Sequence, residues 1–440
     1  MAALTCLLIA AGCTETRFEE ATGEGTVRGI NAVAELDSVA FLIEEIGLGS
    51  VPFKNSSSTA PYDNLTYTFN FDLFIPGETD PRRLASSGVI DVVDGQDYTF
   101  VLTGDATTQQ VILWERTQRD WVGDEAVFEV EVGHLNTALG AVDVYLVPTG
   151  QAVDPTTLVG TVAFSERLDA FEAGSGEYQV IVTTQGQPAD ILFQGDAVTL
   201  LGGQTYIAAV FDADPSITGP ASLRLYNQDG TAVEVPDERF PGTAQFINAS
   251  FGLGNVDVAI AGDFTNPAVT NLGYAEVSAD VEVPGESATY TYVPTGNTMP
   301  LFEEDAFVPT GARDMFILSG PPDDLVTIQL ESLRRSFSTA AQFRIISTIT
   351  NFEAVDIYIR EPGTDINEVN PTFRAVRGFN ELLTSQAGDF EITITDREEK
   401  TPLKPPEIVT FALGDIVEFV LLDDADPNAV QTLSFSNATL

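Results

Sequence analysis

The stretch INASFGLGNVDV, residues 247–258, occurs in four related versions along this chain of 440 residues. The other versions are LNTALGAVDVY at 135–145, ISTITNFEAVDIY at 346–358 and, more distantly, INAVAELDSVAF at 30–41. Each begins with an apolar residue and Asn or Ser, continues through a short loop and ends in a Val-rich run. The versions recur about every hundred residues, which is too long for a solenoid unit and suits one small β-sandwich. The sequence therefore predicts four tandem domains.

A second motif, a glycine before an apolar run, keeps the same register. It occurs at Gly95, Gly203, Gly311 and Gly414. A glycine followed by an apolar run indicates a turn that leads into a strand. Elsewhere apolar and polar residues alternate, as in FEVEV at 128–132, which is the pattern of a half-buried strand. We predict an all-β chain of four tandem immunoglobulin-like antiparallel β-sandwiches after a lipoprotein-type leader, strung end to end, each with its own core.

Clusters of proline, glycine and charged residues separate the four versions and place the domain boundaries. We predict a signal peptide at 1–13, a tether at 14–25, and sandwiches at 26–124, 125–239, 240–338 and 339–440. The basic segment SLRRS, residues 332–336, lies at the last boundary. A solvated linker or an interdomain salt bridge is the simpler interpretation of this segment, and a partner site is the alternative.

The N-terminus, MAALTCLLIAAGC, joins a short apolar run to small residues and a final cysteine. The run is too short to span a bilayer and has the form of a secretory h-region. Ala10–Cys13 resembles the bacterial lipobox, whose cysteine is lipidated. Cys6 and Cys13 are the only cysteines, so we expect a mature chain without disulfides. We predict Cys13 as the lipidation site, a membrane contact through that lipid, and a location in the cell envelope, at the outer membrane or cell surface.

The chain is strongly acidic, with 66 acidic residues against 20 basic ones and a formal net charge of −46. Binding nucleic acid requires clustered Lys and Arg, so nucleic acid is excluded as a partner. Two interpretations of the acidity stay open. One is a solubility coat suited to salty surroundings, where ions screen the self-repulsion. The other is the binding of divalent cations.

The sequence of apolar-Asn-Ala-Ser, short loop and Val-Asp-Val resembles the domain of unknown function 4397 family. The version at 247–258 matches best, the versions at 135–145 and 346–358 keep the aspartate before Val or Ile, and Ala40 replaces it in the first. The resemblance implies β-sandwich repeats in envelope proteins, many of them lipoproteins. It implies no catalytic residues.

Catalysis has little support in the composition. His134 is the only histidine, so no Ser-His-Asp or Cys-His site can recur in four domains. A zinc site of Cys and His is excluded for the same reason. We expect His134 at the surface or at a sheet edge. A glycosidase would need two carboxylates across a cleft, for which small sandwiches offer no obvious place. We predict that the chain is not an enzyme.

Calcium is the one cofactor left open, because its sites are built from loop carboxylates and carbonyls. Asp212 and Asp214 follow the strand after Gly203, and Asp423, Asp424 and Asp426 follow the strand after Gly414. The competing interpretation is an ordinary turn, where Asp, Pro and Asn are favoured for backbone reasons. Both interpretations place these aspartates in loops, and they differ only in whether the loops bind calcium.

Five other side chains have two interpretations each. Asp143, Asp257 and Asp356 alternate with core valines or isoleucines and should face outward, to cap a turn or to bind a partner. Trp114 and Trp121 are the only tryptophans, and either pack between domains or form a sugar-stacking platform.

The predicted function is that of a non-catalytic envelope lipoprotein, a structural or adhesive scaffold at the cell surface. The alternative is a module that binds polysaccharide or another envelope polymer, stiffened by calcium. An envelope polymer or a surface protein is the expected partner besides the membrane. Exposed aromatic residues along a groove would favour the alternative.

Overall fold

The computed structural model describes residues 21–123, 125–213 and 219–436. They form eight small sheets, packed two by two into four β-sandwiches, with one 3₁₀ turn as the single helical element of these ranges. We call them sandwiches 1 to 4 in chain order. Cys13, Asp214 and most of the predicted tether lie outside the described residues. Strand β1 begins at Glu24, just inside the segment predicted as that tether.

Sandwich 1 packs sheet β4-β1-β7-β8 on sheet β3-β2-β5-β6. Its strands are β1 (Glu24–Asn31), β2 (Val39–Ile43), β3 (Ile46–Val51), β4 (Ala60–Asp63), β5 (Thr66–Leu73), β6 (Arg82–Asp91), β7 (Gln96–Gly104) and β8 (Gln109–Thr117).

Sandwich 2 packs sheet β12-β9-β16-β17-β18 on sheet β11-β10-β13-β14, with β15 also paired to β13. Its strands are β9 (Val127–His134), β10 (Val142–Pro148), β11 (Leu158–Val162), β12 (Phe171–Gly174), β13 (Gly176–Thr184), β14 (Gln187–Gln194), β15 (Val198–Leu200), β16 (Thr205–Asp212), β17 (Ala221–Tyr226) and β18 (Ala232–Val235).

Sandwich 3 packs sheet β22-β19-β26-β27 on sheet β21-β20-β24-β25, with β23 also paired to β19. Its strands are β19 (Gly242–Asn248), β20 (Val256–Ile260), β21 (Val269–Leu272), β22 (Glu276–Val277), β23 (Val281–Val283), β24 (Ala288–Pro294), β25 (Phe302–Ala306), β26 (Arg313–Ser319) and β27 (Val326–Glu331).

Sandwich 4 packs sheet β31-β28-β34-β35 on sheet β30-β29-β32-β33. Its elements are β28 (Ala341–Ser347), β29 (Val355–Arg360), the 3₁₀ turn η1 (Ile366–Glu368), β30 (Phe373–Val376), β31 (Gly378–Ser385), β32 (Gly388–Asp396), β33 (Glu407–Phe411), β34 (Ile416–Asp423) and β35 (Val430–Ser436).

The all-β fold predicted from the alternation is confirmed. The four motif glycines all have left-handed φ angles of 69°, 69°, 73° and 88°, which glycine adopts without a steric penalty. Each glycine turns the chain into β7, β16, β26 or β34. These four strands then pair in parallel with the first strand of their own sandwich, β1, β9, β19 or β28. The antiparallel pattern predicted from the sequence thus has one parallel pair in each unit.

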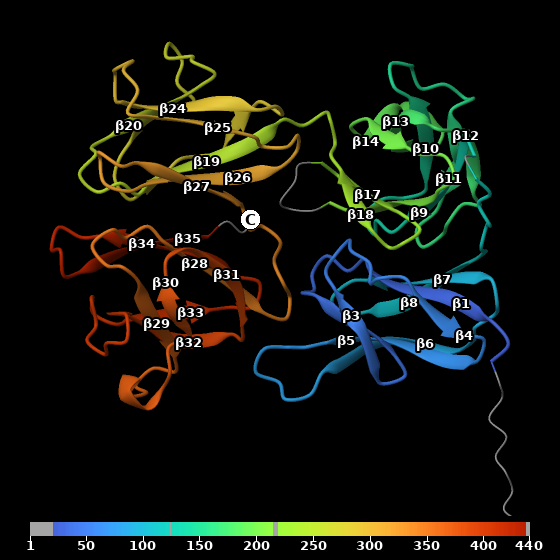
Figure 1. Ribbon diagram of the computed structural model, residues 1–440, viewed down its shortest axis with the longest axis horizontal. Coiled ribbons are helices and arrows are strands. Elements are labelled where there is room, and N and C mark those ends of the chain that lie inside the picture. The colour runs from blue at the N-terminus through green and yellow to red at the C-terminus, as the bar shows by residue number, and fades with distance from the viewer. Residues whose placement is uncertain (1–20, 124, 214–218, 437–440) are drawn as a thin grey trace, which may run out of the picture.

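The expected end-to-end string is wrong, because the sandwiches pack side by side in two pairs. Sandwich 1 packs on sandwich 2 and sandwich 3 on sandwich 4, and the two pairs lie next to each other (Figure 1). The reason lies in the strands that the glycines introduce. In β7, β16, β26 and β34 residues are buried on both faces, so one face fills the core of its own sandwich and the other packs against a neighbour.

Candidate functional site

The repeated asparagine of the motif fastens the loop that follows the first strand. Asn31, Asn136 and Asn248 are fully buried. Their Oδ1 atoms accept hydrogen bonds from backbone N–H groups two residues ahead, over 3.0, 3.0 and 3.2 Å. This is an Asx turn, in which a short polar side chain replaces a backbone partner. The residue that reveals the repeat is therefore structural.

The repeated aspartates cap a hairpin within their own sheet. Asp143, Asp257 and Asp356 accept hydrogen bonds from the backbone N–H groups of Gly186, Gly296 and Glu398, over 2.7, 2.9 and 3.0 Å. Each of those turn residues has a positive φ. All three aspartates are buried, so the expected outward exposure is wrong. Of the two uses left open by the sequence, their carboxylates perform turn capping.

The aspartates considered for calcium also hold loops. Asp212 and Asp423 end β16 and β34, and each accepts the N–H of a threonine in the loop after the first strand. Those bonds measure 2.7 Å from Thr137 and 2.9 Å from Thr350. Burial raises the pKa of Asp212 above its ordinary value, which disfavours the charged form.

Asp424 and Asp426 form a turn of their own. Asp424 accepts the N–H of Asp426 over 2.9 Å, and Asp426 accepts that of Asn428 over 3.0 Å. Across the described ranges no group of three or more Asp, Glu, His or Cys side chains is close enough to hold a metal ion. Asp214 lies outside those ranges, and calcium binding stays a prediction.

His134 is buried, so the expected surface or edge position is wrong. It ends β9, a strand with neighbours on both sides, and none of its surface is exposed. Its Nδ1 accepts the N–H of Asn136 over 3.2 Å, and its Nε2 lies 2.9 Å from the carbonyl oxygen of Gly140. Burial lowers the pKa of the imidazole. Both ring nitrogens are therefore used inside the sandwich.

The tryptophans pack at the junction of sandwiches 1 and 2. Trp114 is buried in the interface and lies 3.4 Å from the carbonyl oxygen of Ser165 through Nε1. Trp121 lies under the guanidinium of Arg119, at 3.8 Å, and donates to Thr205. All eleven tyrosines and both tryptophans belong to the described ranges, and none of them is exposed.

Two sheet-to-sheet contacts, which we call joint 1–2 and joint 3–4, hold the pairs together. Their buried apolar side chains come from strands and loops of both sandwiches. Joint 1–2 contains Ile30, Ala32, Phe53, Val101, Trp114, Leu135, Ile207, Ala209, Phe211 and Tyr226. Joint 3–4 contains Ile247, Ala249, Met315, Ile317, Ile346, Val420 and Leu422. Each joint is an apolar core of its own that two sandwiches share.

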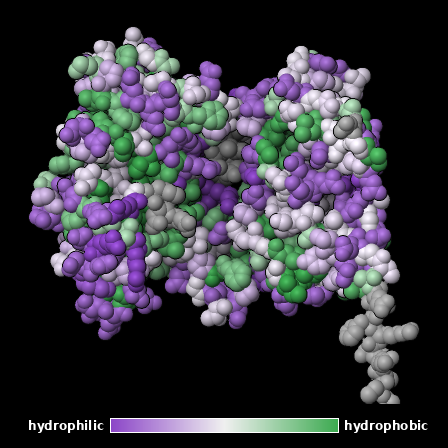
Figure 2. Space-filling view, viewed as in Figure 1, coloured by the Kyte–Doolittle hydropathy of each residue, from purple (hydrophilic) through white to green (hydrophobic). Residues whose placement is uncertain are grey.

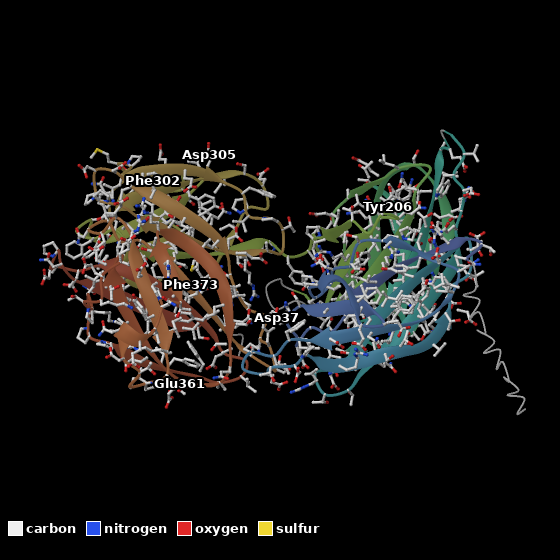
Figure 3. All side chains as sticks on the ribbon, turned by 60° about the horizontal axis from the view of Figure 1, so that its bottom comes forward. Asp37, Tyr206, Phe302, Asp305, Glu361 and Phe373 are labelled. Atoms are coloured by element: carbon white, nitrogen blue, oxygen red, sulfur yellow. The ribbon has the colours of Figure 1, made fainter. Side chains whose placement is uncertain are left out.

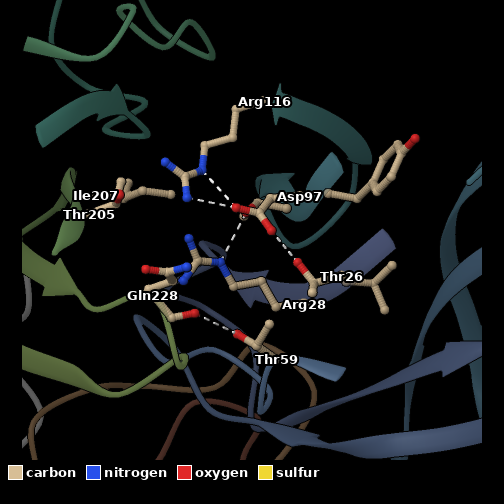
Figure 4. Close-up of a pocket in the computed structure, with 11 residues that line it drawn as sticks. Thr26, Arg28, Thr59, Asp97, Arg116, Thr205, Ile207 and Gln228 are labelled. Carbon is tan, nitrogen blue, oxygen red and sulfur yellow. Dashed lines mark hydrogen bonds and ion pairs between the residues drawn. The ribbon is translucent and has the colours of Figure 1, made fainter. Parts of the chain in front are cut away.

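A small cavity lies inside joint 1–2 (Figure 4). Arg28 and Arg116 line it together with Asp97, which binds Arg116 at 2.7 Å and accepts a short hydrogen bond from Thr26. Burial lowers the pKa of Arg28. The cavity measures about 20 Å³, enough for about one water molecule. It is therefore part of the joint and too small for a ligand.

The basic linker between sandwiches 3 and 4 docks on sandwich 1. Arg335 donates to the carbonyl oxygens of Ala34 and Leu36, at 3.0 and 2.6 Å. Its guanidinium also lies over the rings of Phe53 and Phe337. Through these backbone carbonyls the segment takes the interdomain role that the sequence left open.

The four sandwiches surround a central cavity of about 440 Å³ next to this linker. Phe53 of sandwich 1, Arg224 of sandwich 2, Ser332 at the end of sandwich 3 and Gln342 of sandwich 4 all line it. Hydrophilic side chains surround the hollow between the two halves of the molecule (Figure 2). Asp37, which also lines the cavity, lies between the halves when the molecule is turned (Figure 3). This cavity is the candidate functional site.

No helix in the described ranges is long and apolar enough to cross a membrane. The leader with Cys13 is not among these residues, so the lipid anchor stays a prediction.

Comparisons with known proteins identify no family. No family model matches the chain, and no curated protein matches its sequence. A family 41 carbohydrate-binding module from streptococcal virulence factors is 11% identical over 43% of this chain and 96% of its own, with a TM-score of 0.17. A family 26 module from Eubacterium rectale Amy13K, solved with maltoheptaose, is 14% identical over 47% and 98%, with a TM-score of 0.18. The Bacillus anthracis TIE protein is 10% identical over 92% and 69%, with a TM-score of 0.16.

TM-scores this low support no inference about the present chain. The resemblance to the domain of unknown function 4397 family likewise stays a prediction.

Proposed function

We propose that this chain is a non-catalytic scaffold of the cell envelope, with a structural or adhesive role. The scaffold is anchored through Cys13 and holds an acidic surface in a fixed shape. The observation that carries the proposal is the pair of apolar joints. Domains joined by flexible linkers move relative to one another by default, unless their interface is large and hydrophobic. Two shared cores replace that mobility with rigid pairs.

The distribution of charge supports the same function. Acidic residues such as Asp305 and Glu361 are exposed and lie at the outer margins of the molecule (Figure 3). Many of the basic residues, in contrast, are held in ion pairs with carboxylates. The outer surface therefore repels other acidic surfaces and keeps the scaffold soluble.

The alternative, a polymer-binding module that stacks sugars on aromatic rings, has less support. Among the described aromatic side chains only Phe74, Phe251 and Phe307 are exposed, and they belong to separate loops or strand ends of two sandwiches. Enzyme activity has no support in the buried titratable groups, since His134 and the repeated aspartates serve the fold.

Rigidity is tested by the distance between spin labels at exposed positions 110 on β8 and 187 on β14. Both native cysteines are replaced by serine so that only these two sites react. A narrow distance distribution is expected, as narrow as that of a control pair placed within sandwich 2. A broad distribution across joint 1–2 would contradict a fixed scaffold.

The cellular address is tested with Cys13→Ser. The parent is expected in the membrane fraction and the variant in the soluble fraction, because the lipid is the only predicted anchor. A variant that stays with the membrane would remove the anchor from the proposal, while the rigidity result would stand.

A further inference from the structure

Within the ranges that the structure describes, the pair of sandwiches 1 and 2 and the pair of sandwiches 3 and 4 share no cluster of buried apolar side chains. Each such cluster lies inside one pair or the other. Domains move relative to one another unless a large hydrophobic interface joins them. Each pair is therefore expected to behave as a rigid body, and other contacts must fix how the two bodies are placed.

The two bodies also repel each other electrostatically. Residues 1–239, which include sandwiches 1 and 2, contain 36 acidic and 10 basic side chains, for a formal net charge of −26. Residues 240–440, which include sandwiches 3 and 4, contain 30 acidic and 10 basic side chains, for a formal net charge of −20. Like charges on neighbouring bodies favour their separation. The side-by-side arrangement in Figure 1 therefore needs contacts that oppose this repulsion.

The covalent connection between the bodies is the linker between sandwiches 2 and 3. On one side, Arg239 fastens this linker to sandwich 2 by donating to the carbonyl oxygens of Ile191 and Leu192, at 2.5 and 2.6 Å. On the other side, the carbonyl oxygen of Phe240 accepts the N–H of Gly311 in sandwich 3 at 2.9 Å. The backbone between Arg239 and Phe240 is thus the place about which one body can turn relative to the other.

A second contact joins the bodies at the linker between sandwiches 3 and 4, and we call it the clasp. Two consecutive arginines in this linker have partners in different bodies. Arg334 binds Asp280 of sandwich 3 at 2.9 Å and fastens the linker to its own body. Arg335 donates to two backbone carbonyls of sandwich 1, and the N–H of Ser338 donates to the carbonyl oxygen of Glu35 at 2.8 Å. The clasp therefore joins the last pair of sandwiches back to the first sandwich.

We propose that the protein is a hinged scaffold, in which two rigid bodies turn about the backbone between Arg239 and Phe240 and the clasp of Arg335 and Ser338 holds them closed against their mutual repulsion. The central cavity lies between the bodies, because its lining comes from both, and opening exposes that lining. The proposal rests on the scaffold role, since one contact can set the overall shape only if each pair is rigid.

The test measures the distance between spin labels at positions 89 on β6 and 408 on β33, with both native cysteines replaced by serine. Val89 and Ile408 are 73% and 62% exposed and belong to different bodies. Sandwiches 1 and 4 lie below the hinge in Figure 1, so opening lengthens this distance. The measurement is made in about 0.01 M and about 1 M salt, where charges interact over about 30 Å and about 3 Å.

The parent is expected to give one narrow distribution in both salts. Arg335→Met removes the donors of the clasp, so in dilute salt its distribution should shift to longer distances and broaden. In concentrated salt the repulsion is screened, and the distribution of this variant should return toward that of the parent. Such a return also shows that the variant is folded.

The matched control is Arg334→Met. It removes the same charge from the neighbouring position and leaves the contacts of Arg335 in place, while Ser336 and Gln342 still hold the linker to sandwich 4. Its distribution should equal that of the parent in both salts. The label pair at 110 and 187 is measured in every variant and should stay narrow.

A parent-like distribution for Arg335→Met in dilute salt would overturn the proposal, because the clasp would not be what holds the bodies together. Equal broadening in the two arginine variants would also overturn it, since the lost charge would then be the cause. A broad distribution between 89 and 408 in the parent, beside a narrow one between 110 and 187, would remove the clasp and leave the rigid pairs. A broad distribution between 110 and 187 in the parent would instead contradict the scaffold role itself.

Discussion

Arg28 in joint 1–2 and Arg344 in joint 3–4 occupy matching places and have different partners. Each lies on the first strand of its sandwich and donates through Nη1 to a backbone carbonyl of the neighbouring sandwich, at 2.9 Å. Across the parallel strand pair, Arg28 faces Thr99 and Arg344 faces Glu418. Arg344 Nε lies 2.7 Å from that carboxylate. At these matching places, joint 1–2 puts Arg28 beside a neutral hydroxyl, and joint 3–4 puts Arg344 in a buried ion pair.

The two joints also differ in the kinds of contact that surround these arginines. Joint 1–2 adds aromatic rings and several hydrogen bonds between the sandwiches, such as Ser56 to the carbonyl of Gly230 at 2.7 Å. The buried core of joint 3–4 is aliphatic apart from Met315. Directional contacts fix how two sheets are aligned, whereas aliphatic packing contributes mainly through buried area and tight fit. We therefore expect the joints to respond differently to equivalent changes.

The largest difference is expected from Arg344→Met against Arg28→Met. Arg344→Met removes the guanidinium that pairs with the carboxylate of Glu418, which has no exposed surface, at a cost of about 3–5 kcal/mol. Arg28→Met removes hydrogen bonds to neutral groups and should cost about 1–2 kcal/mol. Urea unfolding followed by circular dichroism measures both.

The control for this pair is the double variant Arg344→Met/Glu418→Met. Replacing both members of a buried ion pair by apolar residues should recover most of the loss. Equal losses in the two single variants would mean that the buried carboxylate does not distinguish the joints.

The next largest effect is expected from truncating the packing. Ile317→Ala in joint 3–4 should cost about 3–5 kcal/mol, because the aliphatic surroundings leave an unfilled cavity. Ile207→Ala in joint 1–2 should cost about 2–3 kcal/mol, since Ile207 already borders the water-sized cavity. Both tryptophans lie at the junction of sandwiches 1 and 2, so their fluorescence reports that pair alone during urea unfolding.

Val326→Ala on β27 is the matched control for the truncations. Val326 is 49% exposed, and its truncation should change stability by less than about 0.5 kcal/mol. A cost for Ile207→Ala above that for Ile317→Ala would reverse the comparison of the joints.

A smaller effect is expected from two tyrosine hydroxyls, one in each joint. Tyr226 donates to the carbonyl of Lys54 at 2.7 Å, and Tyr274 donates to the carbonyl of Asp423 at 2.6 Å. Tyr226→Phe should cost about 1–2 kcal/mol, because the carbonyl is left unpaired in a buried place. Tyr274→Phe should cost about 0.5 kcal/mol, since its hydrogen bond is only partly buried.

The two tyrosine losses should add in the double variant, because the residues lie in different joints. Urea unfolding of the three variants checks the sum. A clear departure from additivity would show that the joints are coupled through the linker at Arg335.

The sequence predicted what local pattern controls. The alternation of apolar and polar residues predicted the strands. The glycines at 95, 203, 311 and 414 predicted the turns, because a left-handed backbone conformation favours glycine. The parallel pairing and the side-by-side packing depend on contacts between residues far apart in the chain. The sequence carries one signal of the side-by-side packing. Runs such as 207–211 and 315–318 are apolar at every position, which indicates strands buried on both faces.

The candidate site had no comparable signal. Its lining residues, such as Phe53, Arg224 and Gln342, come from different sandwiches, and only the folded arrangement brings them together. Asp212, Asp423, Asp424 and Asp426 hold loops or turns. Their sequence pattern could not separate this role from metal binding, because turns and metal sites favour the same residue types.

The effect of His134 on stability is the smallest one at neutral pH. It should make the pair of sandwiches 1 and 2 more sensitive to acid than the pair of sandwiches 3 and 4. Its Nδ1 accepts a backbone hydrogen bond, and burial lowers the pKa of the ring. In the unfolded chain the imidazole takes up its proton near the ordinary histidine pKa, whereas in the folded chain it does so only at a lower pH. The stability contributed by the neutral imidazole is therefore fully present above the ordinary histidine pKa, and it falls as the pH drops from about 7 to 5.

Since no other histidine exists, tryptophan fluorescence should register this loss for sandwiches 1 and 2. His134→Gln should start from a lower stability and lose less of it over the same interval. Parallel curves for parent and variant would mean that carboxylates, and not the imidazole, set the acid sensitivity of this pair.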